Sequence, residues 1–227
     1  MKLLTWNVGL AGNFFRKVMC VLEPKRVSIN NICKRIIQTN SDIIALQEVY
    51  HNDFNLISSQ LNEYYPYKIH EPELGLCFFS KPKISHEYKI IFPRDMLSNC
   101  LRSKNGLLIV REKNTRNFFC NVHLSCGLGC HYEYEYLNLV RKFHFNDNLV
   151  CLGDFNAYRT RNFKKIASKM YINTCKENTF NSYRHPLLVC NFDYIIKYNK
   201  KSKIGTELEC QCIKDYTSDH FPIITEI

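Results

Sequence analysis

Residues 148–154, Asn-Leu-Val-Cys-Leu-Gly-Asp, form an apolar run that ends in an aspartate, and Asn156 follows two positions later. A run of this length and composition predicts a buried β-strand. A single carboxylate at a strand end is more often a turn residue than a catalytic group. The interpretation of Asp154 and Asn156 therefore depends on whether the same pattern recurs elsewhere in the chain.

The pattern recurs at five further places, so the chain has six apolar runs with polar residues at one end. The five are residues 3–6 before Asn7, residues 43–46 before Gln47 and Glu48, residues 119–122 before His123, residues 191–196 around Asp193, and Ser218-Asp219-His220 at the start of the last run. A lone histidine or acid of this kind is usually structural. Their joint occurrence in one chain favours a functional site assembled from strand ends.

Hydrophobic periodicity predicts a fold with more strands than helices. Helices are expected where apolar residues recur at helical spacing, at residues 29–37, 52–61, 133–144 and 162–170. Strands are expected at residues 2–8, 42–46, 74–80, 83–92, 106–112, 118–124, 148–153, 191–197, 207–214 and 221–226. This mixture predicts two β-sheets packed face to face with helices outside, in one domain over residues 1–227.

Composition narrows the classes of partner. Lys and Arg number 31 against 21 acids, a formal net charge of +10, which favours polyanionic partners such as nucleic acid, anionic lipid or phosphorylated small molecules. Charge alone is equally compatible with a role in solubility. No run of 18 apolar residues and no signal-peptide pattern is present, so we expect an intracellular protein that does not insert stably into membranes.

The 12 cysteines are expected to be mostly reduced and buried, since several lie inside apolar runs. Cys126-Cys130-His131 and Cys210-Cys212 do not have the paired C-x-x-C spacing of structural zinc sites. The sequence thus gives little reason to expect either a disulfide framework or a zinc site.

The polar strand ends carry a resemblance to a known family. Thr5-Trp6-Asn7, Leu46-Gln47-Glu48-Val49, Val122-His123-Leu124, Gly153-Asp154-Phe155-Asn156-Ala157, Phe192-Asp193-Tyr194-Ile195 and Ser218-Asp219-His220 resemble the signature series of the endonuclease/exonuclease/phosphatase superfamily. The resemblance spans almost the whole chain and is unspecific for substrate. It implies an α/β fold, a four-layer sandwich of two packed mixed sheets flanked by helices, with the active site at one end of the sheets.

The resemblance also implies a division of roles in a metal-dependent phosphodiesterase. It assigns Mg²⁺, or Mn²⁺ in its place, to Glu48, Asn7 and Asp219, since oxygen ligands suit these cations. The remaining roles are activation of water by Asp154, hydrogen bonding to phosphoryl oxygens by Asn156 and His123, and phosphate binding by His220, oriented by Asp193.

Substrate is the least determined property. Gly9 and His123 differ from the residues that apurinic-site endonucleases carry at those positions. The sequence around Asn7 and Glu48 is similar to that of 5′-tyrosyl-DNA phosphodiesterases and of sphingomyelinases. We expect a monomeric enzyme acting on nucleic acid. Candidate substrate-binding residues are Arg102, Asn105, Arg159, Lys164 and Lys165.

Alternatives remain open for both the substrate and the basic residues. Residues 159–169 could equally form a solvated helix face. A lipid phosphodiesterase would need an exposed apolar loop near the site, for which Asn13-Phe14-Phe15 is the candidate. A non-catalytic binding protein is the third reading, although such a protein should have lost some of the motif residues.

Overall fold

The structure, a computed structural model, describes a core of strands with two flanking helices. The described residues are 1–10, 28–92, 105–115, 117–124, 148–156, 171–173, 179–181, 189–190, 192–198, 210–214 and 217–227. The helices predicted at residues 133–144 and 162–170 lie outside these ranges, as do Cys126, Cys130 and His131.

The first sheet has six strands in the order β13-β14-β1-β2-β4-β3. Their bounds are β1 Lys2–Asn7, β2 Ile43–Gln47, β3 Tyr67–Glu71, β4 Leu76–Ser80, β13 Cys210–Cys212 and β14 Ile223–Glu226. Strands β1 and β2 are parallel, and the strands on both sides of this pair are antiparallel to it. The sheet is therefore mixed, as expected.

The second sheet repeats this plan with the order β5-β6-β7-β8-β12-β9. Its strands are β5 Ile84–Ile91, β6 Gly106–Glu112, β7 Asn117–His123, β8 Asn148–Asp154, β9 Tyr171–Asn173 and β12 Asp193–Tyr198. Here β7 and β8 form the parallel pair, again between antiparallel neighbours. A separate small ribbon joins β10 Phe180–Asn181 to β11 Val189–Cys190.

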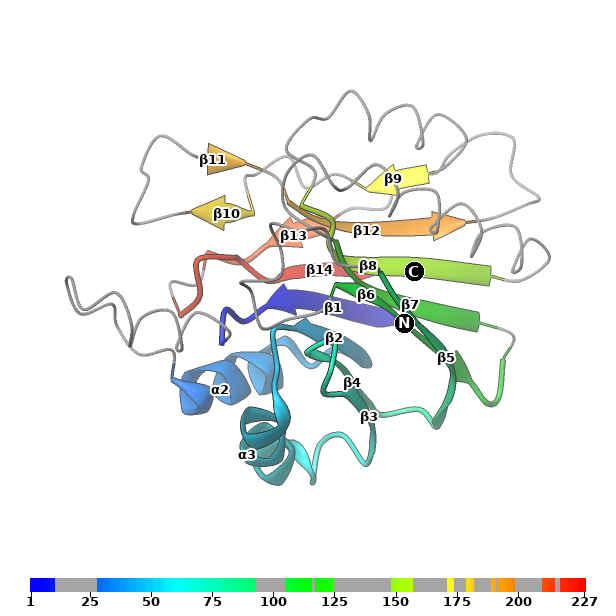
Figure 1. Cartoon of the computed structure of the whole chain (residues 1–227), viewed down its shortest axis with the longest axis horizontal. Coiled ribbons are helices and arrows are strands. Elements are labelled where there is room, and N and C mark those ends of the chain that lie inside the picture. The colour runs from blue at the N-terminus through cyan, green and yellow to red at the C-terminus, as the bar shows by residue number, and fades with distance from the viewer. Residues whose placement is uncertain are drawn as a thin grey trace.

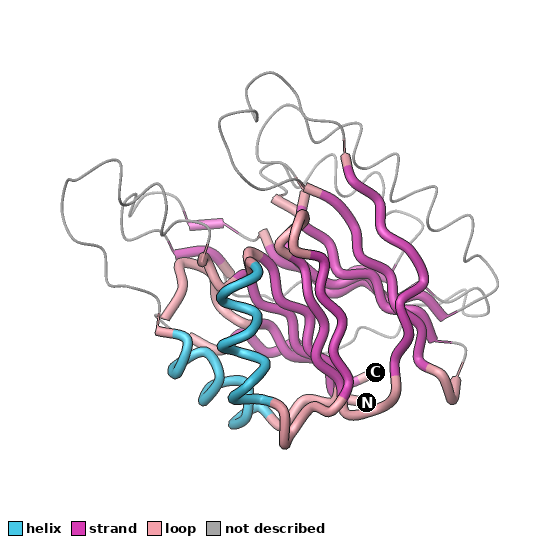
Figure 2. Tube along the Cα trace, turned by 60° about the horizontal axis from the view of Figure 1, so that its bottom comes forward, coloured by secondary structure: helices cyan, strands magenta, loops and turns pink. Residues whose placement is uncertain are grey.

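The helices α2 Ile29–Thr39 and α3 His51–Leu61 cover the outer face of the first sheet (Figures 1 and 2). Helix α2 is capped at its N-terminus by Ser28, whose hydroxyl accepts a hydrogen bond from the backbone N–H of Asn31, and at its C-terminus by Asn40 in the left-handed conformation. Its buried residues Ile32, Cys33 and Ile36 recur at helical spacing and pack on β-strand residues such as Leu4. Neither described helix is long and apolar enough to cross a bilayer.

An apolar core fills most of the space between the two sheets. It is built from alternate residues of facing strands, including Leu3 of β1, Ile43 of β2, Phe119 of β7 and Val150 of β8, all almost fully buried. The two parallel pairs lie opposite each other, since β1 contacts β8 and β2 contacts β7. Burial of these alternate residues is what holds the sheets face to face.

The fold predicted from sequence is confirmed, with two mixed sheets and helices on an outer face. The difference lies in short or half-buried elements. No strand was predicted at β3, because none of its residues is fully buried and its pattern is weak for an edge strand. Leu74 and Gly75, expected to begin a strand, lie in the turn before β4.

The cysteine interpretation agrees with the described part of the chain. Cys33, Cys77, Cys120 and Cys151 are buried thiols outside disulfides. Burial raises the pKa of the Cys33 and Cys77 thiols above their ordinary values, which keeps them protonated and unreactive.

Candidate active site

The candidate site lies where the parallel strands of both sheets end. Because β1 and β2 are parallel, Asn7 and Gln47 lie side by side at the same edge of the first sheet. In the second sheet, His123 and Asp154 are neighbours for the same reason. The two sheets pack face to face, so these four strand ends converge at one end of the space between them.

The inward-facing positions explain which residues reach the site. Side chains alternate across a strand, so Asn7 shares a face with Leu3, and Asp154 shares one with Val150. Leu3 and Val150 both belong to the core between the sheets. The rows that build this core therefore continue directly into the polar residues of the site.

Asp154 is the hub of the cluster. Its Oδ1 accepts a hydrogen bond from the backbone N–H of Asn156 at 2.8 Å, and its Oδ2 accepts one from Nδ2 of Asn7 at 2.9 Å. The same Oδ2 lies 3.8 Å from Nε2 of His220 and 3.9 Å from Nε2 of His123. Asp154 is 1% exposed, so a carboxylate there depends on these nitrogen groups for its stability.

Gly153 permits this arrangement. Its φ is +148°, and a Cβ at this position would lie 2.0 Å from the carbonyl oxygen of Val122 on the neighbouring strand. Only glycine allows β7 and β8 to approach so closely. The close approach brings His123 and Asp154 side by side.

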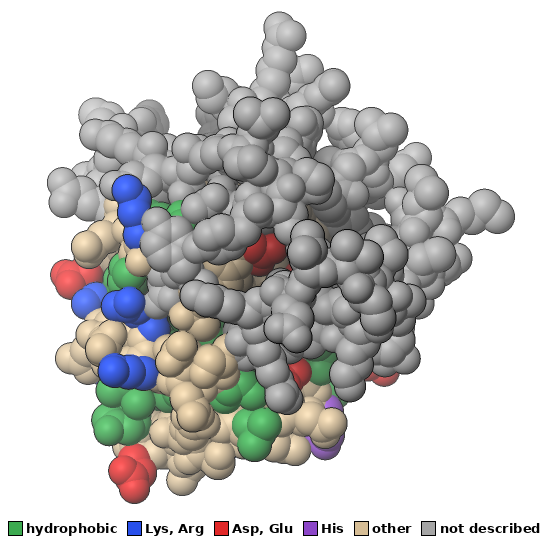
Figure 3. Space-filling model, turned by 90° about the vertical axis from the view of Figure 1, so that its left-hand side faces the viewer, with side chains coloured by type: hydrophobic (Ala, Val, Ile, Leu, Met, Phe, Trp, Pro, Cys, Tyr) green, Lys and Arg blue, Asp and Glu red, His purple; other side chains and the backbone are tan. Residues whose placement is uncertain are grey.

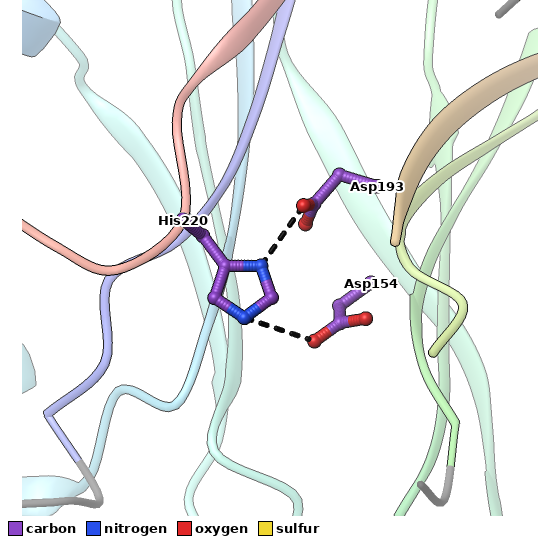
Figure 4. A group of neighbouring side chains, drawn as sticks. All are labelled: Asp154, Asp193 and His220. Atoms are coloured by element: carbon purple, nitrogen blue, oxygen red, sulfur yellow. Dashed lines mark hydrogen bonds and ion pairs between the residues drawn. The ribbon is translucent and has the colours of Figure 1, made fainter. Parts of the chain in front are cut away.

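His220 and Asp193 form a buried pair that links the sheets (Figure 4). Nδ1 of His220, which precedes β14 in the first sheet, lies 2.9 Å from Oδ2 of Asp193 on β12 in the second. Burial alone lowers the pKa of the His220 imidazole, but the Asp193 and Asp154 carboxylates outweigh burial and raise it above its ordinary value. The geometry therefore favours an imidazolium beside the Asp154 carboxylate.

Oxygen-bearing side chains gather on the more exposed side of the hub. Nδ2 of Asn7 lies 3.3 Å from Oε1 of Glu48, and the hydroxyl of Ser218 donates to the Asn7 carbonyl at 2.8 Å and lies 3.3 Å from Oδ1 of Asp219. Gly9, with φ +65°, leaves room here, since a Cβ would lie 3.2 Å from Oδ1 of Asp219. Glu48 and Asp219 are only partly buried, unlike Asp154.

Two of the site residues have unusual backbone conformations. Glu48 has φ +61° and Asn156 has φ +46°, in the left-handed region. Asparagine tolerates this region, whereas for glutamate it costs of the order of 1–3 kcal/mol unless the surroundings compensate. Strain of this kind is concentrated at functional sites, in agreement with the candidate role of Glu48.

Among the residues that the structure describes, two groups are candidates to hold a cation. Asp154, Asp193 and His220 have ligand atoms within 4.8 Å of one another. In that trio, Nδ1 of His220 already contacts Asp193, and an imidazolium has no lone pair to offer a metal. Glu48 and Asp219 offer partly exposed carboxylate oxygens and Asn7 a buried amide oxygen, and such hard oxygen atoms suit Mg²⁺ or Mn²⁺ better.

The two residues expected to contact phosphoryl oxygens differ in their surroundings. Nδ2 of Asn156 donates to the Leu124 carbonyl at 2.7 Å, and this amide carries a second hydrogen. His123 is 6% exposed, and its Nδ1 has no hydrogen-bond partner among the described residues. Asn156 therefore retains a donor hydrogen that a bound phosphate could use, whereas the unpartnered Nδ1 of His123 is buried and its Nε2 lies 3.9 Å from Oδ2 of Asp154.

All eight predicted catalytic and metal-binding residues lie in this one cluster, whereas four of the five predicted substrate-binding residues cannot be compared with it. Arg102, Arg159, Lys164 and Lys165 lie outside the described residues. Asn105 is described, and its carbonyl accepts a hydrogen bond from the Phe92 N–H at the start of β6. Figure 3, which views the end of the sheets where β1 and β8 finish, shows acidic side-chain atoms recessed near its centre and Lys and Arg side chains toward its left-hand edge.

Sequence reasoning missed the residues that support the cluster. Ser218 was noted only as part of a motif, and no role was expected for Thr179, whose hydroxyl oxygen accepts hydrogen bonds from the Phe192 and Asp193 N–H groups. Trp6 donates its indole N–H to the His220 carbonyl at 2.9 Å. Gln47, like Ser218, was noted only as part of a motif. A polar residue at an inward position of a strand was the available signal for Asn121, which binds Gln47 directly behind the cluster.

Comparison with solved structures gives the same fold over the full chain. Beta toxin from Staphylococcus aureus superposes with a TM-score of 0.75 at 17% identity, covering 100% of this chain and 99% of that one. TDP2 from D. rerio, complexed with a single-strand DNA product, gives 0.69 at 16%, covering 99% and 97%. Sphingomyelinase C from Streptomyces griseocarneus gives 0.68 at 16%, covering 99% and 98%.

The family assignment comes from the sequence itself. A search of curated protein sequences found no significant match. Residues 4–220, however, match the Endonuclease/Exonuclease/phosphatase family, and the matched range contains every residue of the cluster. The chain therefore belongs to this family, and it is an enzyme of the metal-dependent phosphodiesterase class that the family represents.

Proposed function

We propose that this enzyme hydrolyses phosphodiester bonds in nucleic acid with Mg²⁺ as its cofactor. The observation that carries the proposal is the convergence on Asp154 of nitrogen groups from both sheets, next to the oxygen cluster of Glu48, Asn7 and Asp219. Hydrolysis of a phosphodiester needs a positioned water, charge stabilisation on the phosphoryl oxygens and assistance to the leaving oxygen. The cluster contains groups suited to the first two.

The side chains present fit a magnesium ion. Glu48 and Asp219 supply carboxylate oxygens on the exposed side of the cluster, and Asn7 supplies an amide oxygen that accepts a hydrogen bond from the Gly9 N–H at 3.0 Å. Mg²⁺ keeps several of its waters, so one or two carboxylates are sufficient. When bound, the cation supplies Lewis-acid stabilisation of the phosphoryl group.

The protein groups around the reacting phosphate then divide the work. Asp154 orients a water and accepts its proton, because one of its oxygens is fixed by the Asn156 N–H. His220, held in position by Asp193, stabilises negative charge on the phosphoryl oxygens. His123 and Asn156 add hydrogen bonds there, so that His220, His123 and Asn156 together provide three donors for the phosphoryl oxygens.

Nucleic acid is the substrate that charge and surface favour. The net charge of +10 suits a polyanion. The described large apolar side chains that are exposed are Leu56 on α3, Tyr64 in the turn after it and Ile91 on β5. A fold neighbour, TDP2 from D. rerio, holds a single-strand DNA product. We further propose that the enzyme acts as a monomer inside the cell, where buried thiols stay reduced.

A lipid phosphodiesterase is the second candidate. It is favoured by the likeness of the fold to sphingomyelinase C. The apolar loop that such an activity needs was expected at Asn13-Phe14-Phe15, which lies outside the described residues. The two candidates share the same hydrolytic cluster and differ only in what binds around it.

A substrate panel separates the candidates. Purified protein with Mg²⁺ would be offered supercoiled plasmid, single-stranded DNA, single-stranded RNA, a 5′-tyrosyl oligonucleotide and sphingomyelin vesicles. We expect hydrolysis of at least one nucleic acid, loss of activity in EDTA, and affinity that falls with salt by a log–log slope of about 0.7–0.9 per phosphate contact.

The matched control is Asp154→Asn, prepared in parallel, because trace nuclease contamination would survive this substitution whereas the enzyme's own activity would not. Hydrolysis of sphingomyelin without hydrolysis of any nucleic acid would replace the nuclease proposal with the lipid one. An absence of hydrolysis across the panel would contradict both.

A further inference from the structure

A layer of buried amide and hydroxyl groups lies between the apolar core and the active-site cluster. Its members are Thr5 of β1, Gln47 of β2 and Asn121 of β7, each 0% exposed. They occupy inward positions between core residues such as Phe119 and site residues such as His123. Polar groups buried this deeply are costly unless hydrogen bonded, so their presence calls for an explanation.

Asn121 links the second sheet to the first through every polar atom of its side chain. Its Nδ2 donates to the carbonyl oxygen of Leu46 on β2 at 2.9 Å and to that of Cys77 on β4 at 3.0 Å. Its Oδ1 accepts a hydrogen bond from Nε2 of Gln47 at 2.7 Å. One side chain of β7 thus holds two strands of the opposite sheet and the residue that precedes Glu48.

The Gln47 side chain continues the link within the first sheet. Its Nε2 also donates to Oγ1 of Thr5 on β1, at 3.1 Å. Its Oε1, in contrast, is buried and has no hydrogen-bond partner among the described residues. An apolar residue would avoid that cost, so a role in core packing alone does not account for glutamine here.

The backbone that this link holds is the strained one. Glu48 has φ +61°, and the backbone is held on both sides of it. Two residues before it, the Leu46 carbonyl accepts a hydrogen bond from Asn121. Directly after it, the Val49 N–H donates to the Gly75 carbonyl at 2.9 Å. A glutamate persists in the left-handed region only where its surroundings determine the backbone. Asn121 and Gln47 supply that constraint on the side facing the second sheet.

We propose that Asn121, acting through Gln47 and the Leu46 carbonyl, is a positioning residue that fixes Glu48 of the first sheet against the Asp154 side of the second. This inference rests on the proposed role of Glu48 in holding the metal. It predicts that loss of Asn121 weakens metal binding and loosens the backbone around Glu48 beyond any effect on stability. A merely structural Asn121 would lower stability without either consequence.

The experiment compares Asn121→Leu with Phe119→Leu. Phe119 is the control because it lies on the same strand and face, is equally buried, and is one inward position further from the site. Two readouts are taken on folded protein well below its melting temperature. They are the affinity for Mn²⁺ by electron paramagnetic resonance, and the hydrogen-exchange rates of the Val49 and Ile44 amides without metal.

We expect Asn121→Leu to weaken Mn²⁺ binding by about tenfold or more, as loss of a group that orients a ligand typically does, and to accelerate exchange at Val49 more than at Ile44. Phe119→Leu should change Mn²⁺ affinity less than about twofold and affect both amides alike. Unchanged Mn²⁺ affinity in Asn121→Leu, or equal effects in the two variants, would overturn the inference.

A second variant decides the matter if Asn121→Leu does not fold. Gln47→Met removes the Asn121 and Thr5 contacts with little change of volume, and it should alter both readouts in the same direction. Unchanged readouts in Gln47→Met would overturn the inference in that case. Failure of the wild-type protein to bind Mn²⁺ would instead contradict the proposed function. The hydrogen-exchange rate of the Val49 amide in the variants would still test whether Asn121 positions the backbone around Glu48.

Discussion

The two ends of the space between the sheets differ in chemistry although the same strands build both. At one end, inward positions such as Leu3, Ile43 and Val150 are apolar and almost fully buried. At the other end, the same rows finish in Asn7 and Asp154, which are as deeply buried but polar or charged. The comparison teaches that the two ends have different roles. The apolar end stabilises the fold, and this stability allows the polar end to keep buried polar and charged groups together for catalysis.

The largest expected effect tests the apolar end. Leu3→Ala removes a fully buried side chain from β1 and should lower the free energy of unfolding by about 2–5 kcal/mol, through lost burial and the cavity left behind. Denaturant unfolding measures this loss. Activity per folded molecule should stay within about twofold, because Leu3 is two inward positions from Asn7. A large loss of activity in folded Leu3→Ala would contradict the claim that the apolar end contributes to stability and not to catalysis.

The next effect tests the polar end. His220→Ala should lower kcat by about 10²–10³-fold with a smaller change in KM, since the proposed stabilisation of phosphoryl charge grows toward the transition state. Asp193→Asn should be milder, because it alters the orientation and charge of the imidazole without removing it. Steady-state kinetics on the best substrate of the panel measures both.

The double variant Asp193→Asn/His220→Ala sharpens this test. Since the two side chains are proposed to act as a unit through the 2.9 Å contact, it should be little worse than His220→Ala alone. Additive losses in kcat would contradict the pair even if each residue proved essential.

The smallest effect concerns backbone strain at the polar end. Glu48→Gly should raise stability by about 1 kcal/mol relative to Glu48→Ala, because glycine adopts φ +61° without the steric cost of a Cβ. For a chain of this size the difference corresponds to about 2–4 °C in Tm. Both variants lack the carboxylate, so calorimetry of the pair isolates the backbone. Equal melting temperatures would show that Glu48 is not strained.

Much of the fold could be predicted from sequence because its central strands are strongly patterned. Residues 106–112 and 148–153 are nearly continuous apolar runs, and the helix at residues 29–37 has a regular apolar stripe. The structure places β6, β8 and α2 there. Edge strand β3 was not predicted, since its alternating and partly exposed residues give only a weak signal.

The candidate site was predictable as a set of residues, because each of its members lies in or beside an apolar run. What the sequence could not provide was the pairing across the sheets. The contacts of Asn7 with Asp154 and of Asn121 with Gln47 join residues 147 and 74 positions apart. Only the packing of one sheet on the other determines which strand ends meet. The same packing shows that Asp154, rather than Glu48, is the hub of the hydrogen-bonded cluster.

The most direct test of the central claim, that the polar strand ends form one metal-dependent hydrolytic site, is a Mg²⁺ titration of activity. Wild type and Glu48→Gln would be compared on the substrate hydrolysed fastest in the panel. We predict no wild-type activity in EDTA, saturable activation by Mg²⁺, and a half-saturating Mg²⁺ concentration at least about tenfold higher in Glu48→Gln. Full wild-type activity in EDTA, or the same half-saturation in both proteins, would contradict the claim.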